Sequence, residues 1–336
     1  MAAPNVQPII DAAWATVEAD LAAKTALLAA TEAERARLQA VVEGLGPMFF
    51  SNWDETKAGT PVDLAGYVET FRDNFDAMSI VNSGQTGGKW YAGPGTHTSF
   101  GDASFKPVGS AIDPYLIANG ECRIRMEKIV NPTTGTASWQ SGLIQTVDAK
   151  GVGFSQAGGY FEARMKFPTN GQGNLANVKG AWPAFWLLSN DAVLPTTKTR
   201  MEFDIVEAYG SDPAGLHATV HYKPAPVLAP GAFAARQTKA NYVGLKSVKN
   251  LAGNKALIWG ANGNMFNGEW KTYGVMFGDT IIQIFVDGLE VCRFPTQPWM
   301  LTPVYILVNL AMNGSEKSTA PSPQDMSIDY VRAMAR

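Results

Sequence analysis

Three carboxylates lie close together in a segment that otherwise has the composition of a buried β-strand. The segment MEFDIVEAYG contains Glu202, Asp204 and Glu207 among strand-forming apolar residues. Side chains alternate between faces along a strand, so Glu202 and Asp204 share one face, whereas Glu207 has the opposite parity. A β-bulge at Ile205-Val206 would add one residue and restore the parity. The segment therefore predicts three acids on one face of a bulged strand.

The spacing of these acids suits a pair of catalytic carboxylates. The Cα atoms of Glu202 and Glu207 would lie four strand steps apart, roughly 13 Å. Their long side chains could bring the carboxyls to about 5–5.5 Å, the separation of a retaining glycosidase, in which one carboxylate attacks the sugar and the other protonates the leaving oxygen. Three acids this close cannot all be ionised, so we expect one to hold a proton, as a general acid must. The E-x-D-x-x-E pattern alone also fits exposed helix faces and calcium ligands.

The chain after residue 65 predicts many short strands that could position these acids. Apolar or alternating runs such as CRIRMEKIV, GGYFEARMKF and WKTYGVMF are bounded by turn residues. In TIIQIFVDGLEVCRF two such runs flank Asp287-Gly288, a strong signal for a two-residue hairpin. Many strands with little helix predict an all-β fold, a single large sandwich or jelly roll.

The N-terminal segment has a different composition and predicts a long helix. Steps of four and three from Ile10 to Leu45 reach eleven positions, of which eight are apolar, as in a heptad seam. We expect a coiled coil that makes the protein a homodimer or homotrimer; a lone amphipathic helix packed on the next domain is the alternative. The predicted organisation is a helix over 1–46, a linker over 47–65 and a catalytic domain over 66–336.

Composition narrows the class of partner. The formal net charge is -3 and no long run of Lys or Arg is present, so nucleic acid is not expected as a partner. No stretch reaches the roughly 18 apolar residues of a membrane span. The N-terminal sequence MAAPNVQPII lacks the basic and apolar regions of a signal peptide. We therefore expect a polysaccharide as the partner and no membrane span.

Several motifs, in order, resemble those of glycoside hydrolase family 16, the laminarinase, agarase and carrageenase group. They begin near Phe71 and include SGLIQT, FEARMK, WPAFW, EFDIVE, ILVNLAMNG and MSIDYVR. The resemblance implies a β-jelly roll of two curved antiparallel sheets, the concave one forming an open cleft. It also implies that Glu202 is the nucleophile, that Glu207 is the general acid/base, and that Asp204 holds and polarises Glu202. Val206 places the chain in the group of members that contain the bulge residue.

Three tryptophans are candidates for stacking on sugar rings. Trp182 and Trp186 are four residues apart and share a strand face, and indole rings suit the C–H faces of sugars. The resemblance implies that Trp182 lies beside the nucleophile, whereas Trp186 suits the core equally well. Trp90 lies in the Gly-rich stretch GGKWYAGPGTH, which predicts a loop that shapes a substrate subsite.

Three polar residues are also candidates for substrate contact. The resemblance offers Arg164 as a sugar contact, although Arg164 could equally form a structural ion pair with Glu162. It implies that His221 lies near the leaving-group side, with a hydrogen-bonded sheet histidine as the alternative. Asn309 is a polar residue in the apolar run ILVNLAM, which suggests that it faces the cleft.

The expected function is that of an endo-acting, retaining glycoside hydrolase that cleaves a β-glucan, a galactan or a bacterial exopolysaccharide or capsule. No cofactor is required. Members of the family often bind one structural calcium ion, but no local acid cluster locates such a site, and no metal ligand is predicted. A non-catalytic carbohydrate-binding or structural virion module and a transglycosylase are the alternatives. The heptad helix suits a phage tail fibre or spike, so we expect a virion-associated or otherwise extracellular protein.

Overall fold

The computed structural model describes residues 14–29, 31–32, 57–92, 97–169, 178–190, 193, 200–223, 265–296 and 300–336. The chain divides into two compact units, Met1–Ser51 and Asn52–Arg336. In the first unit residues 14–29 are helical, within the predicted helix. The seam beyond residue 32 and positions 47–56 of the predicted linker lie outside the described residues, so the coiled coil and the domain boundaries stay predictions. In the described ranges, no helix is long and apolar enough to cross a membrane.

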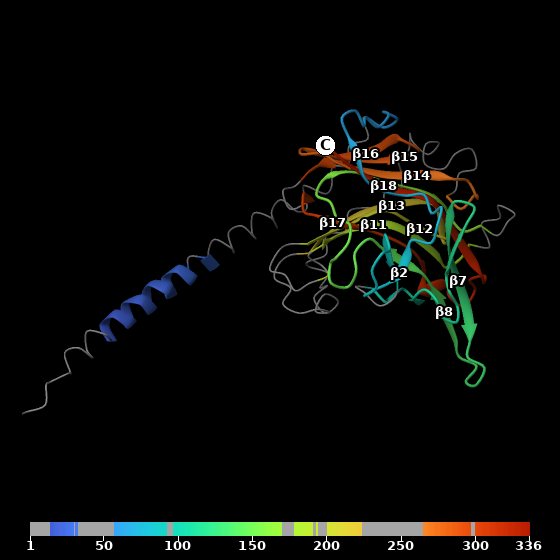
Figure 1. Cartoon of the computed structure of the whole chain (residues 1–336), viewed down its shortest axis with the longest axis horizontal. Helices are drawn as coiled ribbons and strands as arrows, with labels where there is room; N and C mark the ends of the chain where they lie inside the picture. Colours follow the sequence, from blue (N-terminus) through green and yellow to red (C-terminus); the bar gives the residue numbers. More distant parts are fainter. Residues whose placement is uncertain are drawn as a thin grey trace, which may run out of the picture. The chain divides into compact units, whose positions relative to one another are not determined.

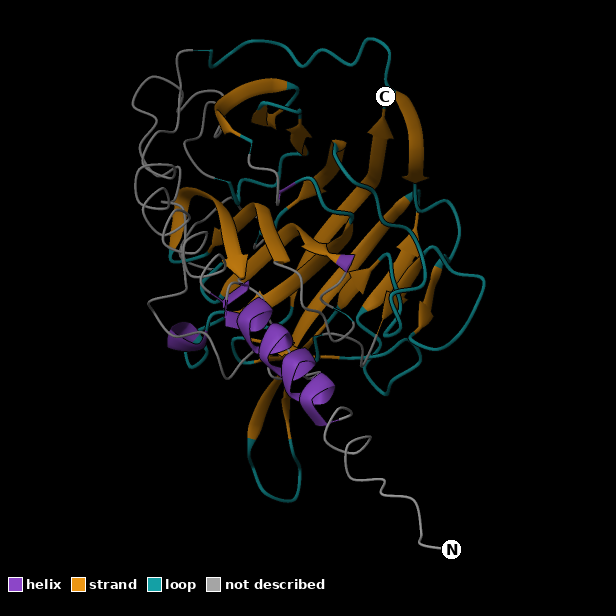
Figure 2. Ribbon diagram, turned by 90° about the vertical axis from the view of Figure 1, so that its left-hand side faces the viewer, coloured by secondary structure: helices purple, strands orange, loops and turns teal. Residues whose placement is uncertain are grey.

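Strands dominate the larger unit (Figure 2). In its described ranges it contains eighteen strands and the short 3-10 helix η6 (Gly314–Glu316). In chain order the strands are β1 (Val68–Asp73), β2 (Ile80–Asn82), β3 (Trp90–Ala92), β4 (Ser99–Phe100), β5 (Ala103–Phe105), β6 (Tyr115–Ala118), β7 (Glu121–Val130), β8 (Ala137–Ser141), β9 (Leu143–Gln145), β10 (Gly159–Lys166), β11 (Ala181–Ser189), β12 (Arg200–Tyr209), β13 (Asp212–Lys223), β14 (Lys271–Phe277), β15 (Ile281–Val286), β16 (Leu289–Pro295), β17 (Val304–Met312) and β18 (Gln324–Ala335).

The strands form two sheets, and the acid segment is in the smaller one. The 11-stranded sheet has the order β16-β15-β14-β10-β18-β7-β8-β5-β4, with β1 paired to β18 and β6 to β7. The 7-stranded sheet has the order β13-β12-β11-β17-β9-β3-β2, and Figure 1 shows β11, β12 and β13 beside one another. Pairs β2–β3 and β5–β8 are parallel, and the other pairs of the named strands are antiparallel. The prediction of an all-β sandwich is confirmed.

The hairpin predicted at Asp287-Gly288 is confirmed. Strands β15 and β16 pair on either side of these two residues. Asp287 has φ 49° and Gly288 has φ 72°, the left-handed conformation at both central positions that a type I′ turn requires.

The core lies between the two sheets. The ring of Phe203 on β12 is 5.3 Å from that of Phe277 on β14 and 6.0 Å from that of Phe294 on β16. Phe161 on β10 contacts Phe277 from within the larger sheet, with 6.0 Å between ring centroids. Because side chains alternate along β12, residues flanking Phe203 point away from this core. The fold therefore directs Glu202 and Asp204 to the opposite face of the smaller sheet.

The end of the predicted linker is packed on the outer face of the larger sheet. The backbone N–H of Val62 donates to a carbonyl in the β15–β16 turn over 2.8 Å. Val62 and Leu64 also pack against a buried apolar cluster, which consists of Tyr160, Met276 and Phe285. This segment is therefore part of the larger unit, which we call the β unit, and it covers apolar surface of the larger sheet.

Candidate active site

The predicted bulge is present in the acid segment. The register of the β12–β13 pair shifts between Asp204 and Glu207. The β11–β12 pair skips Ile205 as well, because adjacent residues on β11 lie opposite Asp204 and Val206. Ile205 and Val206 are both buried. The two apolar residues of the bulge thus fill the interior, and the strand gains the extra residue that the parity argument required.

The register places all three acids on one face. Glu202, Asp204 and Glu207 lie opposite His221, Thr219 and His217 of β13, respectively. Those three partners are spaced by two, so their side chains point the same way. We call this side of the 7-stranded sheet the acid face.

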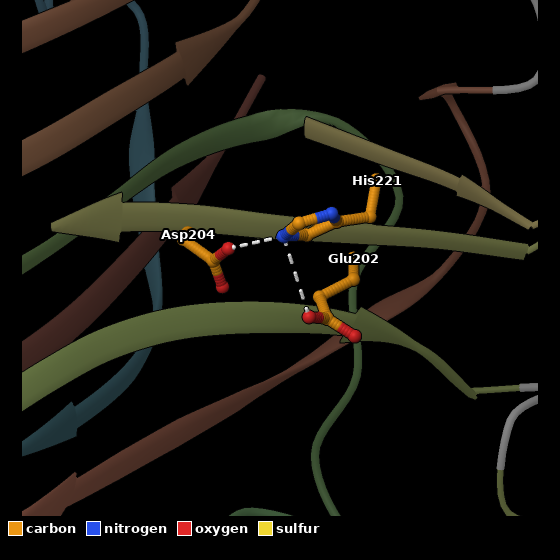
Figure 3. A group of neighbouring side chains, drawn as sticks. All are labelled: Glu202, Asp204 and His221. Atoms are coloured by element: carbon orange, nitrogen blue, oxygen red, sulfur yellow. Dashed lines mark hydrogen bonds and ion pairs between the residues drawn. The ribbon is translucent and has the colours of Figure 1, made fainter. Parts of the chain in front are cut away.

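Glu202, Asp204 and His221 form a close group on the acid face, as Figure 3 shows. Nε2 of His221 lies 2.8 Å from Oδ2 of Asp204 and 3.7 Å from Oε1 of Glu202. Because an ionised carboxylate can only accept, Nε2 carries the hydrogen in the shorter contact. The side chain of Glu202 is 16% exposed, and those of Asp204 and His221 are 7% exposed. His221 therefore orients Asp204 and lies within ion-pair distance of Glu202.

Glu207 accepts hydrogen bonds from two donors, and its carboxyl is protonated at neutral pH. Nε1 of Trp182 donates to Oε1 of Glu207 over 2.9 Å, and the hydroxyl of Tyr209 donates to the same oxygen over 3.1 Å. Burial, followed by the nearby charge of Asp204, raises the pKa of Glu207 to about 8, while both hydrogen bonds and His221 act in the opposite direction. At neutral pH this carboxyl can donate a proton.

The donor atoms of the Glu202, Asp204 and His221 group lie within 4.8 Å of one another, a spacing that could hold a cation. Calcium prefers oxygen ligands only, whereas one of these three donors is an imidazole nitrogen. In addition, a direct hydrogen bond already joins His221 to Asp204. The donor set of this group therefore does not fit a calcium ion.

Trp186 and Asn309 lie on the acid face but are covered by other side chains. Nε1 of Trp186 donates to Oδ1 of Asn309 over 2.8 Å, and both residues are buried. The rings of His97 and Phe100 lie 5.1 Å and 5.7 Å from the Trp186 ring. The pair therefore supports the sheet beneath this aromatic cover.

Two of the predicted substrate contacts lie elsewhere. Trp90 is in β3 rather than in a loop, is fully buried, and donates from Nε1 to Oδ2 of Asp73. Arg164 is in β10 of the larger sheet, where it pairs with Asp329 and stacks on Trp270. Burial removes Trp90 from contact with a sugar, and sheet membership removes Arg164 from the acid face, so both expectations were wrong.

Sequence reasoning missed Tyr209 and Phe100. Tyr209 is two residues beyond Glu207 and shares its face, so alternation along the acid strand could have identified it. Phe100 contacts the rings of both Trp182 and Trp186. Its segment pairs locally with β5, and no pattern in the sequence indicates that it folds over β11.

Comparisons with known proteins find relatives and solved structures that are named as enzymes cleaving β-glycans. No family model matches the sequence. Endo-1,3-1,4-beta-glycanase EglC of Rhizobium meliloti (strain 1021) is 28% identical over 293 residues, covering 81% of this chain and 52% of that protein. Glucan endo-1,3-beta-glucosidase A1 of Niallia circulans is 23% identical over 312 residues, covering 84% of this chain and 40% of that protein. The chain spans about half the length, or less, of the curated relatives that it matches.

Solved structures share the fold. SCLam, a non-specific endo-beta-1,3(4)-glucanase from family GH16, superposes with a TM-score of 0.58 at 18% identity, covering 86% of this chain and 98% of that one. The laminarinase catalytic domain from Thermotoga maritima MSB8 superposes with a TM-score of 0.54 at 19% identity, covering 80% and 98%. The β unit therefore has the jelly-roll fold of these glucanases, and the comparisons support the resemblance to glycoside hydrolase family 16.

Proposed function

We propose that this protein is an endo-acting glycoside hydrolase that cleaves a β-glucan with retention of anomeric configuration. The observation that carries the proposal is the arrangement of the acid face. Glu202 and Glu207 flank Asp204 on one bulged strand, and Glu207 accepts hydrogen bonds from two donors and has a pKa raised to about 8. Two carboxyls with different protonation states are what a retaining glycosidase needs.

In the first step, a carboxylate oxygen of Glu202 attacks the anomeric carbon of the sugar. The bond from that carbon to the glycosidic oxygen breaks, and Glu207 donates its proton to the departing oxygen. The products are a glycosyl ester on Glu202, a free sugar hydroxyl and an ionised Glu207. Asp204, held by His221, keeps negative charge beside both glutamates.

In the second step, a water molecule attacks the same carbon. Glu207, now a carboxylate, takes a proton from the water, and the ester bond to Glu202 breaks. Both glutamates return to their starting states. The residues need no cofactor for either step.

Relatives named endo-1,3-1,4-beta-glycanase and glucan endo-1,3-beta-glucosidase favour a β-1,3- or mixed-linkage glucan as the substrate. The test is the release of reducing ends from a panel of β-glucans, galactans and bacterial capsules by the wild-type protein and by Glu202→Gln. Release that depends on Glu202 supports the proposal and identifies the polymer. Binding without release across the panel would instead favour a carbohydrate-binding module, and oligosaccharide products longer than the donor would favour transglycosylation.

We also propose that the N-terminal helix joins copies of the chain and that the protein works outside the cell or on a virion. On the helix Trp14, Val17, Leu21 and Leu28 are exposed, at the spacing of a coiled-coil seam. Light scattering on the full chain and on a chain beginning at Asn52 tests the association. An oligomer that becomes a monomer on truncation supports the coiled coil, and two monomers would contradict it.

A further inference from the structure

We propose that Tyr209 is a positioning residue for the general acid: together with Trp182 it fixes Oε1 of Glu207 as the acceptor oxygen, so that Oε2 carries the catalytic proton. The inference rests on the proposed function, because it assigns a role within that reaction. Tyr209 was not among the candidate residues predicted from the sequence.

The assignment of the proton follows from hydrogen-bond chemistry. A protonated carboxyl has one carbonyl oxygen, which accepts, and one hydroxyl oxygen, which donates. Oε1 of Glu207 accepts from Nε1 of Trp182 over 2.9 Å and from the hydroxyl of Tyr209 over 3.1 Å. An oxygen that accepts from two donors in this way is the carbonyl oxygen. The proton of the acid therefore resides on Oε2.

The ring of Tyr209 is itself held from two sides. Its centroid lies 5.3 Å from that of Trp182, with 35° between the planes. On the other side the ring of His217 meets it nearly edge-on, at 4.9 Å and 89°. Nε2 of His217 lies 3.4 Å from Oδ2 of Asp212, the residue opposite Tyr209 across the β12–β13 turn. These contacts fix the direction in which the Tyr209 hydroxyl points.

The arrangement suits both steps of the reaction. The titratable groups on the acid face around Glu207 are Glu202, Asp204 and Tyr209 on its own strand and His221 and His217 on β13, while β11 contributes the uncharged donor of Trp182. Both donors can stay bonded to Oε1 when Glu207 becomes a carboxylate. They therefore stabilise the ionised form and leave Oε2 free to take a proton from water.

The first test titrates Glu207 directly and needs no substrate. The protein is labelled with carbon-13 at the glutamate carboxyls, and the Glu207 resonance is assigned by its absence in Glu207→Gln. In Tyr209→Phe, which keeps the ring and removes the donor, we expect the midpoint of this resonance to rise by about one pH unit. Tyr67→Phe is the matched control, because Tyr67 packs against the apolar cluster of the larger sheet, and it should leave the midpoint unchanged. An unchanged midpoint in Tyr209→Phe would overturn the proposal.

The second test is kinetic and separates positioning from mere support of the fold. On the polysaccharide, Tyr209→Phe should lower kcat about ten-fold, the size expected for one hydrogen bond to a charged group, with little change in KM. The basic limb of its pH–rate profile should move to higher pH, and an aryl glycoside whose leaving group needs little protonation should lose much less. If Tyr209→Phe lowers kcat equally on both substrates and leaves the basic limb of the pH–rate profile where it is, the positioning role is overturned. If the resonance shifts but the wild type cleaves no polymer, the proposed function fails while the contact stands.

Discussion

Replacing Glu207 with glutamine should stabilise the protein at alkaline pH, because the fold disfavours the charged form of this carboxyl. The pKa of Glu207 is raised from 4.5 to about 8. Between those values unfolding releases a proton, so the free energy of unfolding falls as pH rises and the loss is complete above pH 8. The pKa difference is about 3.5, and each unit of pKa corresponds to 1.36 kcal/mol, so the loss in the free energy of unfolding has a ceiling of roughly 5 kcal/mol. The glutamine amide oxygen can still accept from Trp182 and Tyr209.

The assay is urea unfolding of the wild type and Glu207→Gln at pH 4 and pH 9. At pH 9 the variant should be more stable by several kcal/mol, up to a ceiling of about 5 kcal/mol, and at pH 4 the gain should vanish because both side chains are then neutral. Glu121→Gln is the matched control, since Glu121 lies on β7 of the other sheet. A Glu207→Gln variant that is no more stable than the wild type at pH 9, or equally stabilised at both pH values, would show that the charged form of Glu207 does not destabilise the fold.

Three further predictions concern the charge of Asp204 beside Glu207 and the packing of the larger sheet. Asp204→Asn removes a charge that raises the pKa of Glu207, so the basic limb of the pH–rate profile should move to lower pH; an upward shift would contradict this. Arg332→Met leaves the buried carboxylate of Glu162 with only its two tyrosine donors, and the free energy of unfolding should fall by about 2–3 kcal/mol in urea with kcat unchanged. Leu64→Ala should lower the free energy of unfolding by about 1–2 kcal/mol, because Leu64 is half-buried against the apolar cluster of the larger sheet. An unchanged value would show that Leu64 does not pack against this cluster.

The local geometry of the acid strand could be predicted because it depends on nearest neighbours. Alternation along a strand has a period of two, so three acids with one mismatched parity require a bulge, and Ile205 supplies it. The Asp287-Gly288 turn was predictable for the same reason, since two residues at positive φ favour these types. The catalytic roles of the acids stay predictions until activity is measured.

The errors arose where the partner of a segment is distant in sequence. Alternation gives the face of Arg164 but not its sheet, and β10 joins the sheet that does not carry the acids. Glycines around Trp90 indicated a loop, yet β3 pairs with β2 and β9 and buries the indole. The sequence left Trp186 open between core and cleft, and its burial depends on the rings of His97 and Phe100, which lie much earlier in the chain. Tertiary packing decided each of these cases.

The proposed function depends above all on cleavage of a glycosidic bond by Glu202 and Glu207 through double displacement. The most direct measurement is proton NMR of the newly formed reducing end during hydrolysis of the β-glucan that the panel identifies. We expect the β-anomer to form first and to equilibrate only later with the α-anomer, and we expect no product from Glu202→Gln. Initial formation of the α-anomer would contradict the nucleophilic role of Glu202 and the retaining mechanism with it.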